Sequence, residues 1–364
     1  MENENKRDEC QTFIVIVTYW LIVIAAKVIR YTILKETLVD MSIGNGWVGK
    51  LTYGINPFMF SLTGESVASQ NSIALFQIFR NLGFNTYIDY EIIISLIWNI
   101  IFLSIIMTFK KKISIFQIIF LMMSVAVLNI WDFCLAKEPL QMLYFVAIYC
   151  ILISKKIDEK HKYGLSILVI LFSCFTYRNY YILIVAFSII SYLLIGKFLA
   201  HKEKITALDL LKIILVFAVT YMAVIIFSKN FYEEAYNSFA YFNKRVTKAT
   251  TDLSGLFHSE NLLIMTIDYI ILVIRMLFPL ELIKFGPQYL IYAIYQIMIT
   301  IIVIKALMGI KTNEKIKMYA IYIFVGFLFA SATFEPDFGS WVRHEAVVLP
   351  VIMLMADFYE SKKD

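Results

Sequence analysis

Long apolar blocks separated by short, lysine-rich connections dominate the chain. Crossing a bilayer core about 30 Å thick takes about 20 mostly apolar residues per helix, and a helix satisfies its own backbone hydrogen bonds in lipid. The pattern therefore predicts an all-α, polytopic transmembrane bundle of about ten spans. The predicted spans are 12–31, 92–109, 113–131, 139–154, 163–177, 180–196, 210–228, 288–304, 318–334 and 340–356.

Lysine and arginine are concentrated on one face of the predicted bundle. Cytoplasmic connections of membrane proteins are enriched in both residues, so we predict that this face is cytoplasmic and that both termini lie inside. Such an arrangement requires an even number of crossings. Six segments contain 19 of the 33 basic residues within 60 positions: 1–11, 110–112, 155–163, 197–212, 305–317 and 357–364.

An eleventh apolar block covers 261–280. As a further span it would place a polar connection on the wrong face of the membrane. We therefore predict that 261–287 forms a re-entrant or interfacial helix on the outer face, ending near Pro279. Asp268 and Arg275 are seven residues apart and share one face of this helix. In the alternative, 261–280 crosses the membrane and a weaker block does not.

The composition agrees with a membrane protein. Hydrophobic residues make up 60% of the 364 residues and charged residues 17%, against about 45–50% and 25% in soluble domains. We predict one integral membrane domain, 1–364, with two long outer segments at 35–90 and 229–287. The net charge of +5 is a signal of topology, so we expect no nucleic-acid partner.

Several charged residues lie where the predicted spans meet the outer face. An ionisable residue in or beside a span is a functional hypothesis by default. Lys27 and Arg30 share one face of the first span, although both side chains could simply extend to the interface. Lys137 and Glu138 precede a predicted span as a functional pair or as a neutralised helix cap. Arg178 is a lone charge in the turn between two apolar blocks.

The segment 334–345, before the last predicted span, is dense in charge. Three acids, an arginine and a histidine lie within eleven residues, which topology alone does not explain. Glu335, Asp337, Arg343 and His344 are therefore candidate site residues. The histidines are too isolated along the chain for a metal site, and we expect neither a metal nor a cofactor.

The outward-facing candidates combine guanidinium, ammonium and carboxylate groups. Guanidinium binds phosphate in a bidentate fork and stays charged at any relevant pH. A neighbouring carboxylate can orient or deprotonate a hydroxyl, and the aromatic residues of 229–287 suit stacking on sugar rings. Fixed cations stabilise a leaving pyrophosphate. The set predicts a site for an anionic, lipid-linked glycan at the outer leaflet.

Three short motifs stand at the predicted outer ends of spans. They are Ala136-Lys137-Glu138-Pro139, Tyr177-Arg178-Asn179-Tyr180 and Glu335-x-Asp337-x-Gly339-Ser340-x-x-Arg343-His344. Together with about ten spans and large outer loops over most of the chain, these motifs resemble the Wzy-type bacterial polymerases of O-antigen and capsular polysaccharide.

The resemblance implies an enzyme of the bacterial cytoplasmic membrane that acts on the extracytoplasmic face without a metal. A growing glycan on undecaprenyl pyrophosphate passes to the non-reducing end of the next lipid-linked repeat unit. The resemblance leaves open whether the chain works together with a flippase and a chain-length regulator. The implied roles are pyrophosphate binding for Arg178, Arg343, Lys137 and Arg275, action on the acceptor hydroxyl for Glu335, Asp337 or Glu138, and orientation by His344.

Other functions remain open from the sequence. A glycosyltransferase using polyprenyl-phosphate sugars would share the topology, but it usually has an acidic pair in the first outer loop, where Glu36, Asp40 and Glu65 are scattered. A lipid-linked oligosaccharide flippase or transporter normally has polar residues at mid-helix and repeated halves. Here 92–109 and 318–334 contain no charge, and the halves show no similarity. A structural membrane subunit or an acyltransferase completes the alternatives.

Replacing Arg178 or Arg343 with alanine should abolish long glycan chains and leave the membrane level of the protein intact, because each change removes a fixed cation from the outer face. Lys110→Ala, on the predicted cytoplasmic face, should have little effect. The lipid-linked glycans of a complemented deletion strain, resolved by size on a gel, provide the measurement. Equal activity in all three variants would exclude an outer-face site.

Overall fold

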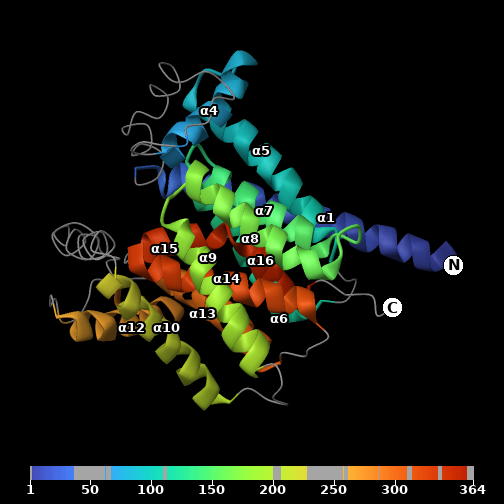
Figure 1. Cartoon of the computed structure of the whole chain (residues 1–364). Coiled ribbons are helices and arrows are strands. Elements are labelled where there is room, and N and C mark those ends of the chain that lie inside the picture. The colour runs from blue at the N-terminus through green and yellow to red at the C-terminus, as the bar shows by residue number, and fades with distance from the viewer. Residues whose placement is uncertain are drawn as a thin grey trace. The chain divides into compact units, whose positions relative to one another are not determined.

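The computed structural model describes residues 2–36, 62, 67–109, 113–199, 206–227, 257, 261–285, 287–309, 314–334 and 338–358. All regular elements within these residues are helices (Figure 1), as the apolar blocks predict. They are α1 (Glu2–Thr32), α4 (Val67–Asn81), α5 (Tyr87–Ile106), α6 (Ile115–Val127), η2 (Leu128–Asp132), α7 (Glu138–Ile153), α8 (Glu159–Thr176), α9 (Tyr181–Ser191), η3 (Tyr192–Leu199), α10 (Ala207–Phe227), α12 (Leu262–Leu277), η4 (Leu280–Phe285), α13 (Pro287–Met308), α14 (Lys315–Phe334), α15 (Phe338–Ala346) and α16 (Leu349–Met355).

Several of these helices could cross a membrane. By length and composition, five helices in the described part of the chain qualify, and the bent pair of α15 and α16 makes a sixth if it forms one span. Helices α7, α9 and α10 contain shorter apolar stretches. The five are Phe13–Thr32, Tyr87–Ile106, Ile115–Asp132, Tyr289–Met308 and Lys315–Phe334. The number of ten spans and the orientation stay predictions.

The contacts divide the chain into two compact units, and the prediction of one domain is not tested by this division. Unit 1 is Met1–Leu143, Phe175–Arg178 and Phe358–Glu360, and unit 2 is Tyr144–Cys174, Asn179–Asp357 and Ser361–Asp364.

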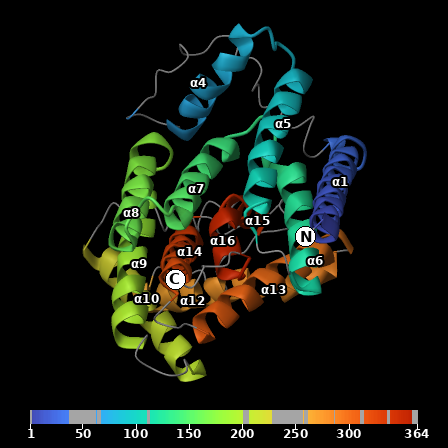
Figure 2. The ribbon, with the colours of Figure 1, turned by 90° about the vertical axis from the view of Figure 1, so that its right-hand side faces the viewer.

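Polar bonds connect α1, α5 and η2 in unit 1. Arg30, near the end of α1, pairs with Glu91 near the start of α5, and Tyr19 in the middle of α1 donates its hydroxyl to Asn99 Oδ1 at 2.7 Å. The two helices are therefore antiparallel (Figure 2). Asn99 also donates to Asn129 Oδ1 at 2.8 Å. Such bonds hold helices together where lipid removes the hydrophobic driving force between them.

The exposed side of α5 is largely apolar, and its buried side contains polar residues. Glu91, Ser95 and Asn99 are buried. Exposed apolar residues recur at every fourth position, namely Ile88, Ile92, Leu96 and Ile100. A soluble helix has the opposite arrangement, whereas a helix in lipid turns its polar residues toward the bundle interior. The burial pattern of α5 is thus consistent with a membrane protein.

Helix α14 forms the centre of unit 2. Residues 320–333 are all buried, and α9 packs along the helix. The two backbones approach closely at Gly326, where an added Cβ would lie 2.7 Å from the Ile184 carbonyl oxygen and 2.7 Å from the Ser188 nitrogen. Glycine therefore permits this contact, as small residues do at helix interfaces in membranes.

Stacked aromatic rings extend the core of unit 2. The Phe217 ring of α10 stacks on Phe329 of α14 with centroids 4.1 Å apart, and Tyr221 of α10 stacks on Tyr269 of α12 at 3.9 Å. Tyr269 also donates its hydroxyl to the Phe329 carbonyl at 2.6 Å. Ring stacking adds to the free energy of area burial, so α10, α12 and α14 are held together by one aromatic layer.

The last predicted span, 340–356, is broken in the structure. Helices α15 and α16 meet at an angle of 72°. Pro350 lies at the start of α16, and proline lacks an N–H and disfavours a helical conformation of the preceding residue. The break therefore has a local cause.

The helices before residue 107 differ most clearly from the sequence prediction at α5 and α4. Helix α5 begins at Tyr87, five residues before the predicted position 92, because Thr86 and Asp89 form a reciprocal cap. Asp89 N donates to Thr86 Oγ1 at 3.2 Å and Thr86 N to Asp89 Oδ2 at 2.9 Å. Helix α4 occupies part of the outer segment 35–90, for which only turns and short apolar stretches were predicted.

Helix α12 falls in the predicted re-entrant or interfacial segment 261–287. It ends at Leu277, two residues before Pro279, as predicted, and the short helix η4 follows. Its 16 residues are fewer than the about 20 that cross a bilayer directly.

Gly326→Ala should destabilise the protein by about 1–3 kcal/mol, because the new methyl group overpacks a backbone contact. Gly164→Ala is the matched control. Its Cβ meets nothing within 4 Å, and alanine favours a helix over glycine by about 1 kcal/mol. Thermal unfolding of the purified protein in detergent should show a lower Tm for Gly326→Ala alone. An unchanged Tm would contradict the close packing of α9 on α14.

Candidate functional site

The eight residues predicted from the sequence fall into three groups. The groups are Lys137, Glu138 and Arg178 in unit 1; Arg275, Arg343 and His344 in unit 2; and Glu335 and Asp337, which lie outside the described residues. Each unit contains a buried polar cluster of its own.

A buried ion pair joins α1 to α5 in unit 1. Arg30 Nη2 lies 2.8 Å from Glu91 Oε1, Arg30 Nε donates to Oε2 at 3.2 Å, and the two side chains are 2% and 1% exposed. Tyr87 donates to Oε1 at 2.6 Å and Tyr31 to Oε2 at 2.7 Å. Each carboxylate oxygen thus accepts two hydrogen bonds, which offsets the loss of hydration of a buried charge.

Two cations of α1 also bind carbonyl groups at the end of the π-helix η2. Arg30 Nη1 donates to the Ile130 carbonyl, and Lys27 Nζ donates to the Phe133 carbonyl at 2.6 Å. Carbonyl groups at the C-terminus of a helix carry partial negative charge. The expectation that Lys27 and Arg30 extend to the interface is therefore wrong for Arg30, which is buried and paired.

The connection between η2 and α7 is buried as well. Asp132, Cys134 and Glu138 are all less than a tenth exposed. Burial raises the pKa of the Cys134 thiol to about 12, and the charges of Arg30 and Glu138 also act on it. The connection is thus buried from Asp132 at the end of η2 to Glu138 at the start of α7.

A hydrogen bond links the end of α8 to the first turns of α7. Tyr177 donates its hydroxyl to Gln141 Oε1 at 3.0 Å across 36 positions of the chain. Gln141 lies about one helical turn after Glu138, and Arg178 directly follows Tyr177. This bond brings the Lys137–Glu138 pair and Arg178 to one region. We call these five residues the α7–α8 site.

The α7–α8 site combines a buried carboxyl group with accessible cations. Glu138 is 1% exposed, whereas Arg178 is half-buried. The Arg178 guanidinium lies 5.5 Å from the centroid of the Tyr177 ring, within the range of a cation–π contact. Asn71 of α4 donates to the Thr176 carbonyl at 2.6 Å, so α4 is bonded to the end of α8. The site can receive an anion beside a carboxyl group.

The second group lies on α15 around a buried acid, Glu345. Trp341 Nε1 donates to Gln296 Oε1 at 3.1 Å, and Gln296 Nε2 donates to Glu345 Oε1 at 3.2 Å. Glu345 is 0% exposed, and His344 is 3% exposed. Arg343 is half-buried. His344 therefore points into the unit, and Arg343 is the more accessible of the two predicted residues.

Arg275 is engaged close to its own helix. Its Nε lies 2.8 Å from Glu281 Oε1 of η4. Asp268, predicted on the same face of α12, is buried and accepts from the Phe257 backbone N–H at 3.3 Å. The pair with Glu281 partly neutralises the charge of Arg275, which makes Arg275 a weaker candidate for pyrophosphate binding than Arg178 or Arg343.

Comparison with known proteins adds no family to this description. No protein-family model, no curated protein and no solved structure matches the chain. Among the described residues, no three His, Cys, Asp or Glu side chains gather so that they could hold a metal ion.

Glu91 is the buried acid that sequence reasoning missed, whereas Glu345 is one of the three acids of the charged segment before the last predicted span. Glu91 lies next to the predicted start of a span at 92, so it reads as an ordinary flanking charge. A signal was present nonetheless, because Arg30 within an apolar helix requires a counterion. Glu345 sits in the charged segment, but its partner Gln296 is neutral and 49 positions away.

Glu91→Ala should destabilise the protein by about 3–5 kcal/mol, because Arg30 would remain buried without its counterion. The double variant Arg30→Met with Glu91→Met should recover most of the loss, since neither charge remains. Glu159→Ala is the control. It removes one partner of the Lys315–Glu159 pair, which is 51% and 53% exposed, and should change little. The Tm in detergent distinguishes these variants, and equal losses for Glu91→Ala and Glu159→Ala would contradict the assignment.

Proposed function

We propose that the protein polymerises lipid-linked glycan repeat units on the extracytoplasmic face of a bacterial cytoplasmic membrane. The α7–α8 site is the observation that carries this proposal. It offers a carboxyl group for an acceptor hydroxyl and cations for an anionic leaving group, at the end of apolar helices. Glycans on polyprenyl pyrophosphate contain both of these groups, the acceptor hydroxyl and the anionic leaving group.

The proposal includes about ten spans with both termini in the cytoplasm. The alternating direction of α1 and α5 in unit 1 supports it, because Arg30 near the end of α1 meets Glu91 near the start of α5. The lysine-rich connection 110–112 follows the last residue of α5 in the sequence, and so comes after the end of α5 that is far from Glu91. Basic residues favour the cytoplasmic side.

The reaction that fits the α7–α8 site is a glycosyl transfer. Glu138 takes the proton of the acceptor hydroxyl while that oxygen bonds to the anomeric carbon of the growing glycan. The bond from this carbon to the pyrophosphate oxygen breaks, and the electron pair leaves with the pyrophosphate. Arg178 and Lys137 neutralise the developing charge. The buried position of Glu138 keeps bulk water away from the transferred proton.

The residues around α15 form the second candidate group. Arg343 is proposed as a further pyrophosphate contact, and Glu335 or Asp337 as alternatives to Glu138 for the acceptor hydroxyl. His344 is buried, which suits orientation of a neighbour better than direct binding of substrate. A flippase that delivers repeat units and a chain-length regulator are the proposed partners.

Glu138→Gln should lower polymer formation by about 10²-fold or more, because the amide keeps the shape of the side chain and cannot take a proton. Arg178→Lys should also impair the reaction, since lysine keeps the charge and loses the bidentate fork. Lys212→Ala, whose side chain is 60% exposed, is the control and should support normal chains. The glycan profile of a deletion strain carrying each variant provides the measurement, with membrane levels checked in parallel.

The same profile separates the alternative functions and the two groups. Single repeat units without long chains establish a polymerase, unfinished units indicate the glycosyltransferase, and complete units on the cytoplasmic side indicate the flippase. Glu335→Gln and Asp337→Asn test the second group. Full activity of Glu138→Gln together with loss in Asp337→Asn would move the base to the segment before α15.

A further inference from the structure

The turn between α7 and α8 is held in a fixed shape. Lys162, in the first turn of α8, donates from Nζ to the Leu152 carbonyl at 2.8 Å, and this amine is buried. The His161 N–H donates to the Asp158 carbonyl at 2.9 Å. The Lys162 side chain thus satisfies a carbonyl group at the end of α7.

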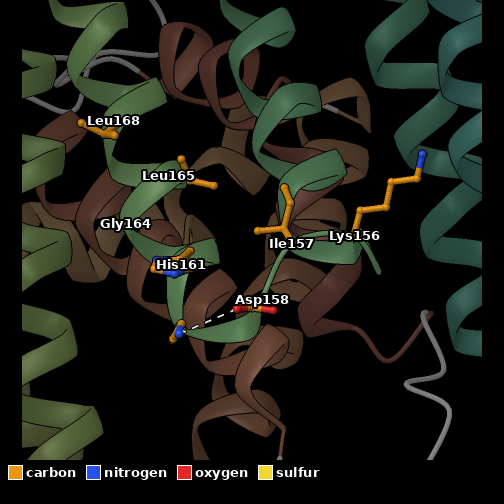
Figure 3. Close-up of a pocket in the computed structure, with 8 residues that line it drawn as sticks. Lys156, Ile157, Asp158, His161, Gly164, Leu165 and Leu168 are labelled. Atoms are coloured by element: carbon orange, nitrogen blue, oxygen red, sulfur yellow. Dashed lines mark ion pairs between the residues drawn. The ribbon is translucent and has the colours of Figure 1, made fainter.

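A pocket lies on this turn, and none of the residues that line it belongs to the α7–α8 site. Figure 3 shows His161, Gly164 and Leu165 following one another along α8, with Ile157 across from them and Lys156 extending away from that helix. The lining is polar at the turn and apolar along the helix. The full lining is Lys156, Ile157, Asp158, Lys160, His161, Gly164, Leu165 and Leu168.

An exposed apolar stripe continues from the pocket along α8. Leu165, Leu168 and Phe172 follow His161 at spacings of four, three and four residues, so all lie on one helical face. Each of these side chains is exposed, Phe172 to 59%. From Leu165 to Phe172 the stripe spans seven residues, about 10 Å at 1.5 Å per residue, which is about a third of a bilayer core of about 30 Å.

We propose that this pocket binds the phosphate headgroup of an anionic phospholipid, with one acyl chain along Leu165, Leu168 and Phe172. Lysine is a compact charge that pairs with phosphate, and Lys156 and Lys160 both line the pocket. The apolar stripe continues from the pocket along α8 and covers part of one leaflet. A free inorganic anion has no apolar part that could contact the stripe.

Asp158 opposes the anion in this arrangement. Its carboxylate lies 3.8 Å from Lys160 Nζ, and both side chains are 73% exposed. An exposed pair of this kind is weak, so a lipid phosphate can displace the carboxylate from the amine. Removal of the Asp158 charge should therefore strengthen lipid binding, a gain that damage to the fold would not produce.

Native mass spectrometry of the purified full chain, after exposure to phosphatidylglycerol and phosphatidylcholine with identical acyl chains, tests the proposal. The wild type should retain phosphatidylglycerol about tenfold better, as expected for two lysines near an anionic headgroup. Lys156→Ala with Lys160→Ala should abolish this preference, and Asp158→Asn should increase it. Lys212→Ala with Lys305→Ala removes the same charge elsewhere and should preserve it.

Three results would overturn the proposal. Equal retention of the two lipids by the wild type would show that charge has no role. An unchanged preference in the Lys156 and Lys160 double variant would place the lipid elsewhere. Displacement of phosphatidylglycerol by inorganic phosphate at an equal concentration would assign the pocket to the free anion.

Discussion

A charged arginine in an apolar helix requires a counterion, and Arg30 imposes this requirement on unit 1. Glu91 meets it with both carboxylate oxygens, and two tyrosine hydroxyls complete the shell. The same guanidinium reaches the Ile130 carbonyl, so one side chain fixes α1, α5 and η2 together.

Both units contain buried bonds between polar side chains. In unit 1 they include Tyr19 and Asn99 at the middle of the helices, and in unit 2 Trp341, Gln296 and Glu345. Unit 2 adds a close backbone contact at Gly326 and stacked rings around Phe329 of α14. Such contacts hold helices together where lipid offers no hydrophobic driving force for their association.

Much of the helix content could be predicted, because apolar blocks of span length have few other stable forms in lipid. The prediction is wrong at the start of α5, which the reciprocal cap of Thr86 and Asp89 places at Tyr87. Glu91 therefore lies inside the helix, where it pairs with Arg30, 61 positions away. The site was predicted only as separate charges. The bond that brings them together joins Tyr177 to Gln141, two neutral residues that a search for charges does not consider. The partner of a buried polar group is set by tertiary packing, which one sequence does not reveal.

The long separation of Arg30 from Glu91 has a consequence for biogenesis. The two residues are 61 positions apart, so α1 leaves the ribosome and reaches the membrane before its counterion has been made. Arg30 lies in the last turn of α1, and an ionisable residue in or beside a span pairs with a partner. In the membrane topology that we propose, Arg30 would therefore obtain its counterion only once α5 lies beside α1.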